Sequence, residues 1–85
     1  MIFKEFEIKK NGGIGRVEAQ QIVRRAMRFE CDIFFDWRAG KINAKSVMGV
    51  IAMGLKRGDK IVVILKGEDE NEAEADLERL FLREL

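Results

Sequence analysis

The chain has 85 residues, with one cysteine, no histidine and no proline, and 47% of its residues are hydrophobic. This length fits one domain with its own core, which we expect to span residues 1–85. Without histidine, the chain has no imidazole base and no Ser–His or Cys–His nucleophile pair. A lone cysteine also excludes an internal disulfide and a thiolate–imidazole zinc site. We therefore expect no enzyme, no metal and no cofactor.

The net charge of +1 conceals two parts of opposite charge. Residues 68–85 hold eight acidic and two basic side chains, whereas residues 1–67 hold fourteen basic and seven acidic ones. A basic body suits a nucleic acid or an acidic protein surface as a partner. The simpler interpretation, which we favour, is that Arg24, Arg25 and Arg28 form the solvated face of a helix.

The start of the chain and its only thiol indicate a cellular compartment. Residues 1–6 alternate and carry charge, unlike a signal or transit peptide. No apolar run is long enough to cross a membrane. Together with the single cysteine, these features predict a cytoplasmic protein without a membrane partner. Cys31 lies in an apolar stretch, so we expect a buried thiol rather than a reactive one.

The first third of the chain predicts a strand, a loop and a helix. Residues 2–8 alternate between apolar and charged, which is typical of a half-buried strand. Residues 9–15 contain three glycines and predict a loop. Residues 16–29 follow the helical period. The core side chains expected from these elements are Ile2, Phe6, Ile8, Ala19, Ile22, Val23 and Ala26.

The next segment predicts a hairpin. Residues 31–37 alternate and form a second strand, with Cys31, Ile33, Phe35 and Trp37 on one face. Arg38-Ala39-Gly40 is the turn, with Gly40 available for a positive φ. Residues 41–44 form a short third strand.

The remaining elements are two helices and a strand. Residues 46–53 predict a short helix that Gly54 closes. Residues 60–66 are strongly apolar and predict a central strand. The last helix starts at Asp69 or Asn71, with acidic residues in its first turn. Its buried stripe is Ala73, Leu77, Leu80, Phe81 and Leu85.

The order of elements is βαββαβα, which predicts an α+β fold. We expect an open-faced β-sandwich, in which a four-stranded antiparallel sheet carries three helices on one face. The other sheet face stays partly solvated, and Asp32 and Asp36 belong to it. Two carboxylates on such a face are more typical of solvation than of catalysis.

Ser46 stands where a strand gives way to a short helix, which is a natural N-cap position. The apolar run 47–53 that follows is too rich in large side chains for one short helix to bury completely. A phosphate on Ser46 would place about two negative charges at the positive end of the helix dipole. The simpler interpretation is that Ser46 is a cap and nothing more.

The segment 43–50 reads Asn-Ala-Lys-Ser-Val-Met-Gly-Val. It resembles the regulatory serine segment of HPr, the small phosphocarrier of the bacterial sugar phosphotransferase system, and in particular its catabolite-repression branch. The resemblance covers nearly the whole chain and implies an HPr-like domain. Its further matches are Phe29, Asp32, Ile33, Gly67, Asp69, Glu70 and Ala73.

The family's phosphohistidine site is lost in this sequence. By resemblance, Gly15 stands at the histidine position and Glu18 at the proline position. Val17 stands at the position of the family's arginine, although Arg16 lies one residue earlier. Because glycine has no side chain to accept a phosphoryl group, the resemblance implies a protein without phosphocarrier activity.

The resemblance implies that the serine site remains. Ser46 would be phosphorylated by HPr kinase/phosphorylase, and the product would act on a LacI-type catabolite control regulator. Lys45 would lie beside the phosphate, and Arg16 would replace the lost arginine. The apolar patch around the serine would comprise Val47, Met48 and Ile51, with Met48 and Ile51 exposed, and Val17 would be a further partner-binding residue. A related branch exchanges its first strand, which implies a homodimer.

Two other functions are compatible with the sequence. The chain would be a degenerate HPr-like scaffold that is never phosphorylated, or a module that binds anions or RNA through residues 12–16. Gly12 to Gly15 fit the spacing of an RNA-binding KH loop. The element order does not fit that fold, and no aromatic pattern for base stacking accompanies the loop. We therefore do not expect direct nucleic-acid binding.

Overall fold

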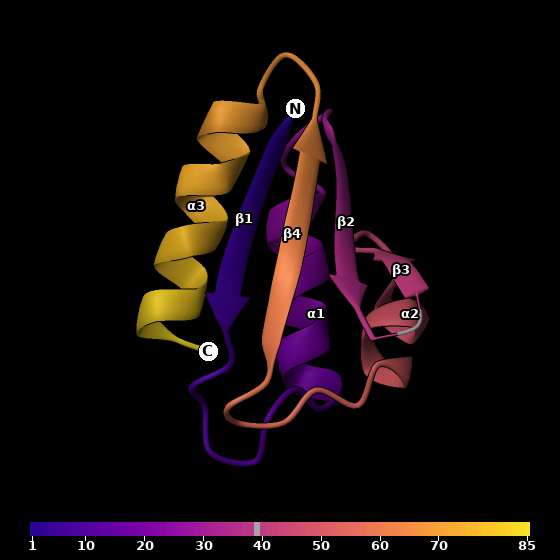
Figure 1. Cartoon of the computed structure of the whole chain (residues 1–85), viewed down its shortest axis with the longest axis vertical. Helices are drawn as coiled ribbons and strands as arrows, with labels where there is room; N and C mark the ends of the chain where they lie inside the picture. The colour runs from indigo at the N-terminus through magenta and orange to yellow at the C-terminus, as the bar shows by residue number, and fades with distance from the viewer. Residues whose placement is uncertain (39) are drawn as a thin grey trace.

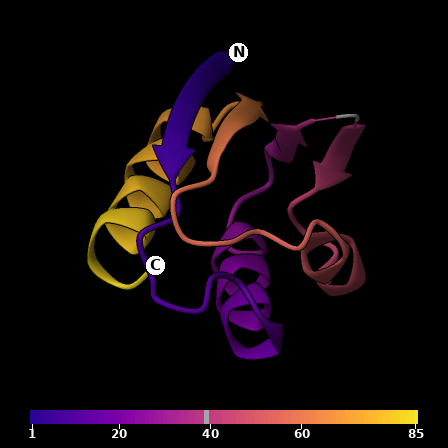
Figure 2. The ribbon, with the colours of Figure 1, turned by 60° about the horizontal axis from the view of Figure 1, so that its bottom comes forward.

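A computed structural model describes residues 1–38 and 40–85. In this part of the chain, four strands form one antiparallel sheet in the order β1-β4-β2-β3, and three helices cover one of its faces (Figures 1 and 2). The open-faced β-sandwich predicted from the sequence is confirmed. In chain order the elements are β1 (Ile2–Glu7), α1 (Arg16–Ala26), β2 (Asp32–Trp37), β3 (Gly40–Asn43), α2 (Val47–Ala52), β4 (Lys60–Lys66) and α3 (Glu70–Arg83).

β4 is one of the two inner strands, as its apolar run predicts. It pairs with β1 on one side and with β2 on the other. Ile61, Val63 and Leu65 are buried against the helices. On the opposite face, Asp32 is exposed and Asp36 is half-buried. Among the described helices, none is long and apolar enough to cross a membrane.

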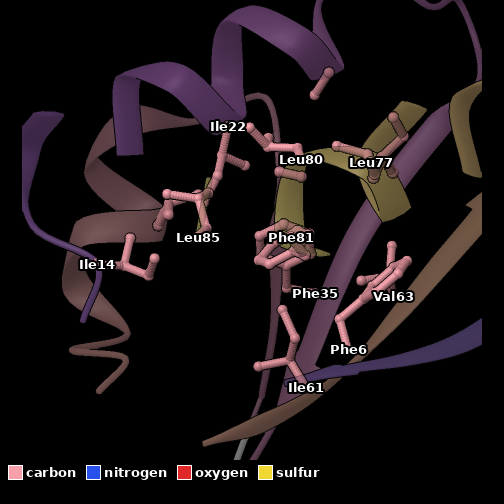
Figure 3. Packing of buried hydrophobic residues seen from close by; sticks show 14 of the residues in the cluster. Phe6, Ile14, Ile22, Phe35, Ile61, Val63, Leu77, Leu80, Phe81 and Leu85 are labelled. Atoms are coloured by element: carbon pink, nitrogen blue, oxygen red, sulfur yellow. The ribbon is translucent and has the colours of Figure 1, made fainter. Parts of the chain in front are cut away.

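The core lies between the sheet and the helices (Figure 3). Phe81 of α3 stacks on Phe6 of β1, with ring centroids 5.1 Å apart, and meets Phe35 edge-on at 6.1 Å. Such aromatic pairs add about 1 kcal/mol beyond the area they bury. The predicted stripe of α3 is confirmed, and Leu85 extends it with 2% exposure.

Arg25 corrects the expectation of a fully solvated arginine face. Its side chain is half-buried, and its Nε lies 3.4 Å from Oδ2 of Asp76 in α3. Its Nη1 also lies 3.8 Å from Oε2 of Glu84. Arg25 points toward α3 because it lies on the side of α1 that packs there, whereas Arg24 and Arg28 are exposed.

The hairpin turn also differs from the prediction. Trp37 and Gly40 pair directly, so the loop between them has two residues. A loop of this length needs a positive φ at its first residue, and Arg38 has φ 53°. Gly40 instead begins β3, and Ala39 of the expected turn lies outside the described residues. The Arg38 guanidinium lies 4.3 Å from the centre of the Trp37 ring, which supports the turn.

The helix predicted to reach Phe29 ends as an α-helix at Ala26. The chain continues as a tighter turn, because the amides of Arg28 and Phe29 donate to carbonyls three residues back. Val23 is half-buried rather than fully buried.

Candidate functional site

Ser46 is the N-cap of α2, as predicted. Its backbone is extended, with φ −112° and ψ 111°, and its Oγ accepts a hydrogen bond from the Gly49 amide at 3.1 Å. The side chain is half-buried. The hydroxyl therefore satisfies one of the free amides at the start of the helix while it remains partly open to solvent.

Gly49 allows α2 to lie close to β3. A Cβ at this position would stand 2.7 Å from Cγ2 of Ile42 and 3.1 Å from Oγ of Ser46. The first distance is shorter than real Cβ contacts, so a larger residue would push α2 away or displace the serine. The glycine therefore sets the position of the Ser46 hydroxyl.

Lys45 is tied to the C-terminal side of α1. Its Nζ donates to the Phe29 carbonyl at 2.7 Å, and its amide donates to Oδ1 of Asn43 at 2.9 Å. The ammonium group that was expected beside a phosphate on Ser46 thus already has a partner. A phosphate would have to compete with the Phe29 carbonyl for it.

The apolar patch on α2 is smaller than the sequence suggests. Met48 is 75% exposed, whereas Val47 and Ile51 are half-buried and pack against the core. Val50 is fully buried. The expected exposure of Ile51 is therefore wrong, because this residue lies four positions after Val47, on the side of α2 that leans on the core.

A second exposed apolar side chain lies on the neighbouring helix. α1 and α2 contact each other beneath the sheet (Figure 2). Val17, in the first turn of α1, is 63% exposed, and Arg16 beside it is also exposed. We call Ser46, Met48, Arg16 and Val17 the α1–α2 surface.

The start of α1 is capped by a carboxylate. Oε1 of Glu18 accepts the Gly15 amide at 2.9 Å, and its Oε2 lies 2.9 Å from Nζ of Lys10. These contacts, led by that of Lys10, hold the pKa of Glu18 below its usual range. A negative charge thus already occupies the positive end of the helix, next to Gly15.

The glycine-rich loop does not form an open cradle for an anion. The amides of Gly13, Ile14 and Gly15 donate to the Lys10 carbonyl, the Leu55 carbonyl and the Glu18 carboxylate. Glu18 would also repel an anion. These contacts count against the anion or RNA-binding module.

Comparison with known proteins identifies the family of this chain. A family model described as "PTS HPr component phosphorylation site" matches residues 2–82. The chain belongs to the HPr family. It is 35% identical over 73 residues to the HPr-like protein Crh of Bacillus subtilis, which covers 86% of each chain.

Solved structures of the HPr family share the fold. HPr of Thermoanaerobacter tengcongensis aligns with a TM-score of 0.91 and 32% identity, covering 96% of this chain and 92% of that one. Crh of Bacillus subtilis aligns with a TM-score of 0.77 and 32% identity, covering 100% and 98%, and is described as a dimer with a swapping domain.

The contact that sequence reasoning missed is Glu18 with Lys10 and Gly15. A Glu three residues after an N-cap is the signature of a capping box, but that pattern normally starts with Ser or Thr. Because Gly15 is the cap residue, only the hydrogen bond from its amide to the Glu18 carboxylate forms, and no side chain of the cap residue accepts an amide in return. Glu18 therefore carried half of the sequence pattern, but the glycine did not match the other half.

Proposed function

We propose that this HPr-family chain is a cytoplasmic regulatory protein of carbon catabolite control, switched by phosphorylation of Ser46 and without phosphocarrier activity. The observation that supports the proposal is that one possible phosphorylation position has a hydroxyl and the other has no side chain. Ser46 caps α2 beside the exposed Met48, whereas Gly15, at the start of α1, offers no side chain to phosphorylate. Similarity to Crh supports the same role.

Phosphorylation of Ser46 would change the charge of the surface around α2, which a partner protein can recognise. The phosphate adds about two negative charges and three acceptor oxygens next to the free amides of α2. Met48 stays exposed beside it. A partner would then meet an anion and an apolar side chain together on the α1–α2 surface.

The partners proposed are HPr kinase/phosphorylase, which would modify Ser46, and a LacI-type catabolite control regulator, which would bind the product. Arg16 is exposed, which supports the proposal that it replaces the family's arginine, whose position is Val17. Val17 adds a second apolar contact on the same surface. A homodimer is a further assembly that we propose for this chain.

The test is phosphorylation of the purified chain with ATP, magnesium and an HPr kinase/phosphorylase, followed by intact-mass measurement. We expect one phosphate per chain and none on the Ser46→Ala variant. An authentic HPr in the same tube controls for kinase activity. If that HPr is labelled and this chain is not, the serine segment is an inherited scaffold and the proposal is wrong.

A further inference from the structure

The open face of the sheet carries a row of apolar side chains at positions where polar ones are usual. In this row, Phe3 of β1 and Phe34 of β2 both pair directly with Ile64 of β4, which lies between them. The helices do not cover this face, since α1 lies behind the strands in the view of Figure 1. Ile64 is nevertheless only 8% exposed. Neighbouring side chains therefore shield it, and the two phenylalanines flank it directly.

The apolar row lines a groove. A hollow of about 300 Å³ opens on this face, and Phe3, Phe34 and Ile64 all line it. Phe3 is 63% exposed and Phe34 is half-buried, so both rings remain available to a ligand. Because Ile64 is buried between two partly exposed rings, it forms the floor of the groove and the rings form its walls. We call this site the sheet groove.

Two lysines lie on opposite sides of the apolar row. Lys66 of β4 and Lys41 of β3 line the sheet groove and are exposed. Lys66 follows Ile64 by two residues, whereas Lys41 pairs with Asp36, on the other side of the row. Strand spacing separates the two lysines by about 15 Å. Within the described part of the chain, neither lysine forms an ion pair, so both ammonium groups are free for a ligand.

The charges of this face narrow the class of ligand. Among the described residues that line the sheet groove, Asp32 is the one acid, while Glu5 and Asp36 belong to the next row of the same face. A nucleic acid would bring its phosphates against these carboxylates. A fatty acid has one carboxylate and reaches one lysine only. A short peptide with two acidic side chains reaches both lysines.

We propose that the sheet groove is a docking site for an extended segment of a partner protein, in which an apolar side chain lies between two acidic residues. The apolar side chain packs between Phe3 and Phe34, and the two carboxylates pair with Lys41 and Lys66. In an extended segment, residues i, i+2 and i+4 point to one side and span about 14 Å, which matches the separation of the lysines. The α1–α2 surface lies on the helical side of the molecule, so this docking does not depend on phosphorylation.

The probe is the acetylated and amidated pentapeptide Glu-Thr-Leu-Thr-Glu, titrated into the isotope-labelled full chain and followed by NMR. We expect the amides of Phe3, Phe34 and Ile64 to shift, with a Kd of about 1 mM, because a contact this small binds weakly. One control peptide has alanine in place of leucine, and the other has lysine in place of both glutamates. Each control should bind at least about fivefold more weakly than the probe.

Matched variants test the walls and the charges of the sheet groove. Phe3→Ser removes one wall and should weaken binding of the probe by at least about fivefold. Leu82→Ser is its control, because Leu82 is 58% exposed but lies on α3, and it should leave the affinity unchanged. Lys41→Glu and Lys66→Glu should each weaken binding of the glutamate peptide and strengthen binding of the lysine peptide.

Several results would overturn the proposal. One is that the groove amides do not shift with up to about 10 mM probe. Another is equal binding of the glutamate and lysine peptides, or of the probe to Phe3→Ser and Leu82→Ser. Shifts of the groove amides with protein concentration alone would show that a second copy covers this face. Sodium octanoate that binds more tightly than the probe would assign the groove to a fatty acid. If Phe3→Ser is unfolded, the two lysine variants decide.

Discussion

Single residues set the backbone spacing at both ends of the α1–α2 surface. Gly13 has φ +71°, and a Cβ on it would stand 2.3 Å from the Leu55 carbonyl oxygen. Backbone atoms cannot give way as a flexible side chain can, so Gly13 fixes the loop before α1. Gly49 instead brings α2 against side-chain atoms of Ile42 and Ser46.

Gly13→Ala should destabilise the protein by about 2 kcal/mol more than Gly12→Ala. Both residues have positive φ, which costs a non-glycine residue about 1–2 kcal/mol. Only Gly13 adds a clash with backbone, because a Cβ on Gly12 meets no described atom within 4 Å. Urea denaturation measures both variants, and equal losses would show that the contact with Leu55 is dispensable.

Gly49→Ala should lower stability by about 1 kcal/mol or more. Helix propensity alone predicts a gain of about 1 kcal/mol, so the sign separates the two effects. The loss follows from the 2.7 Å approach to Ile42. Ala52→Gly, at an exposed position of α2, serves as the propensity control. Thermal unfolding is the measurement, and a higher Tm for Gly49→Ala would contradict the close packing of α2 on β3.

At the scale of elements, Asp69 joins the start of α3 to the segment before β2. It is the N-cap residue of α3, yet its side chain reaches across the fold instead of capping that helix. Its two carboxylate oxygens accept the amides of Glu30 and Cys31, each at 2.9 Å. Burial, followed by hydrogen bonding to the Asp69 carboxylate and by its charge, raises the pKa of the Cys31 thiol to about 11, which keeps it inert at neutral pH.

This link predicts a loss of stability in acid. The amide of Glu30, then that of Cys31, holds the pKa of Asp69 below 3.8. A lowered pKa contributes stability above pH 3.8, and the contribution disappears as the pH falls through the folded value. Asp69→Asn should therefore be less stable than the wild type at neutral pH, and this difference in the free energy of unfolding should shrink below pH 3.8. Urea denaturation at several pH values measures it. A constant difference between variant and wild type would contradict the charged link.

Sequence patterns predicted the elements more fully than the contacts between them. Alternation in β2 and the apolar run of β4 specify strands, because one or both faces of each must be buried. The Ser46 cap was also readable, since its partner Gly49 lies three residues away. Two contacts join residues far apart in sequence, Asp69 with Glu30 and Lys45 with Phe29. No local sequence pattern predicts such contacts.

At the scale of the whole molecule, most acidic side chains of the last helix form ion pairs with the N-terminal ammonium, Lys4 or Arg25. The N-terminal ammonium of Met1 lies 2.8 Å from Glu70, and Lys4 approaches Glu74 and Glu78. Arg25 joins α1 to α3 through Asp76. The acidic last helix is therefore paired within the fold and joins β1 and α1.

Met48→Lys should weaken binding of the phosphorylated chain to the catabolite control regulator by about tenfold or more. Exposed apolar anchors at an interface commonly contribute this much. Leu82→Lys is the matched control, because Leu82 is also largely exposed but lies on α3, on the opposite side of the fold from α2 (Figure 1). Calorimetric titration measures both, and equal affinities for the two variants would remove Met48 from the interface.

We propose above all that this chain is phosphorylated on Ser46 as a regulatory signal, and that it does not carry a phosphoryl group at the start of α1. The most direct measurement is intact mass after exposure to two donors in parallel, ATP with HPr kinase/phosphorylase and phosphoenolpyruvate with the phosphotransferase that charges HPr. We predict one phosphate from ATP, absent in Ser46→Ala, and none from phosphoenolpyruvate. Labelling by phosphoenolpyruvate, or failure of ATP to label a chain whose HPr control is labelled, would contradict the account.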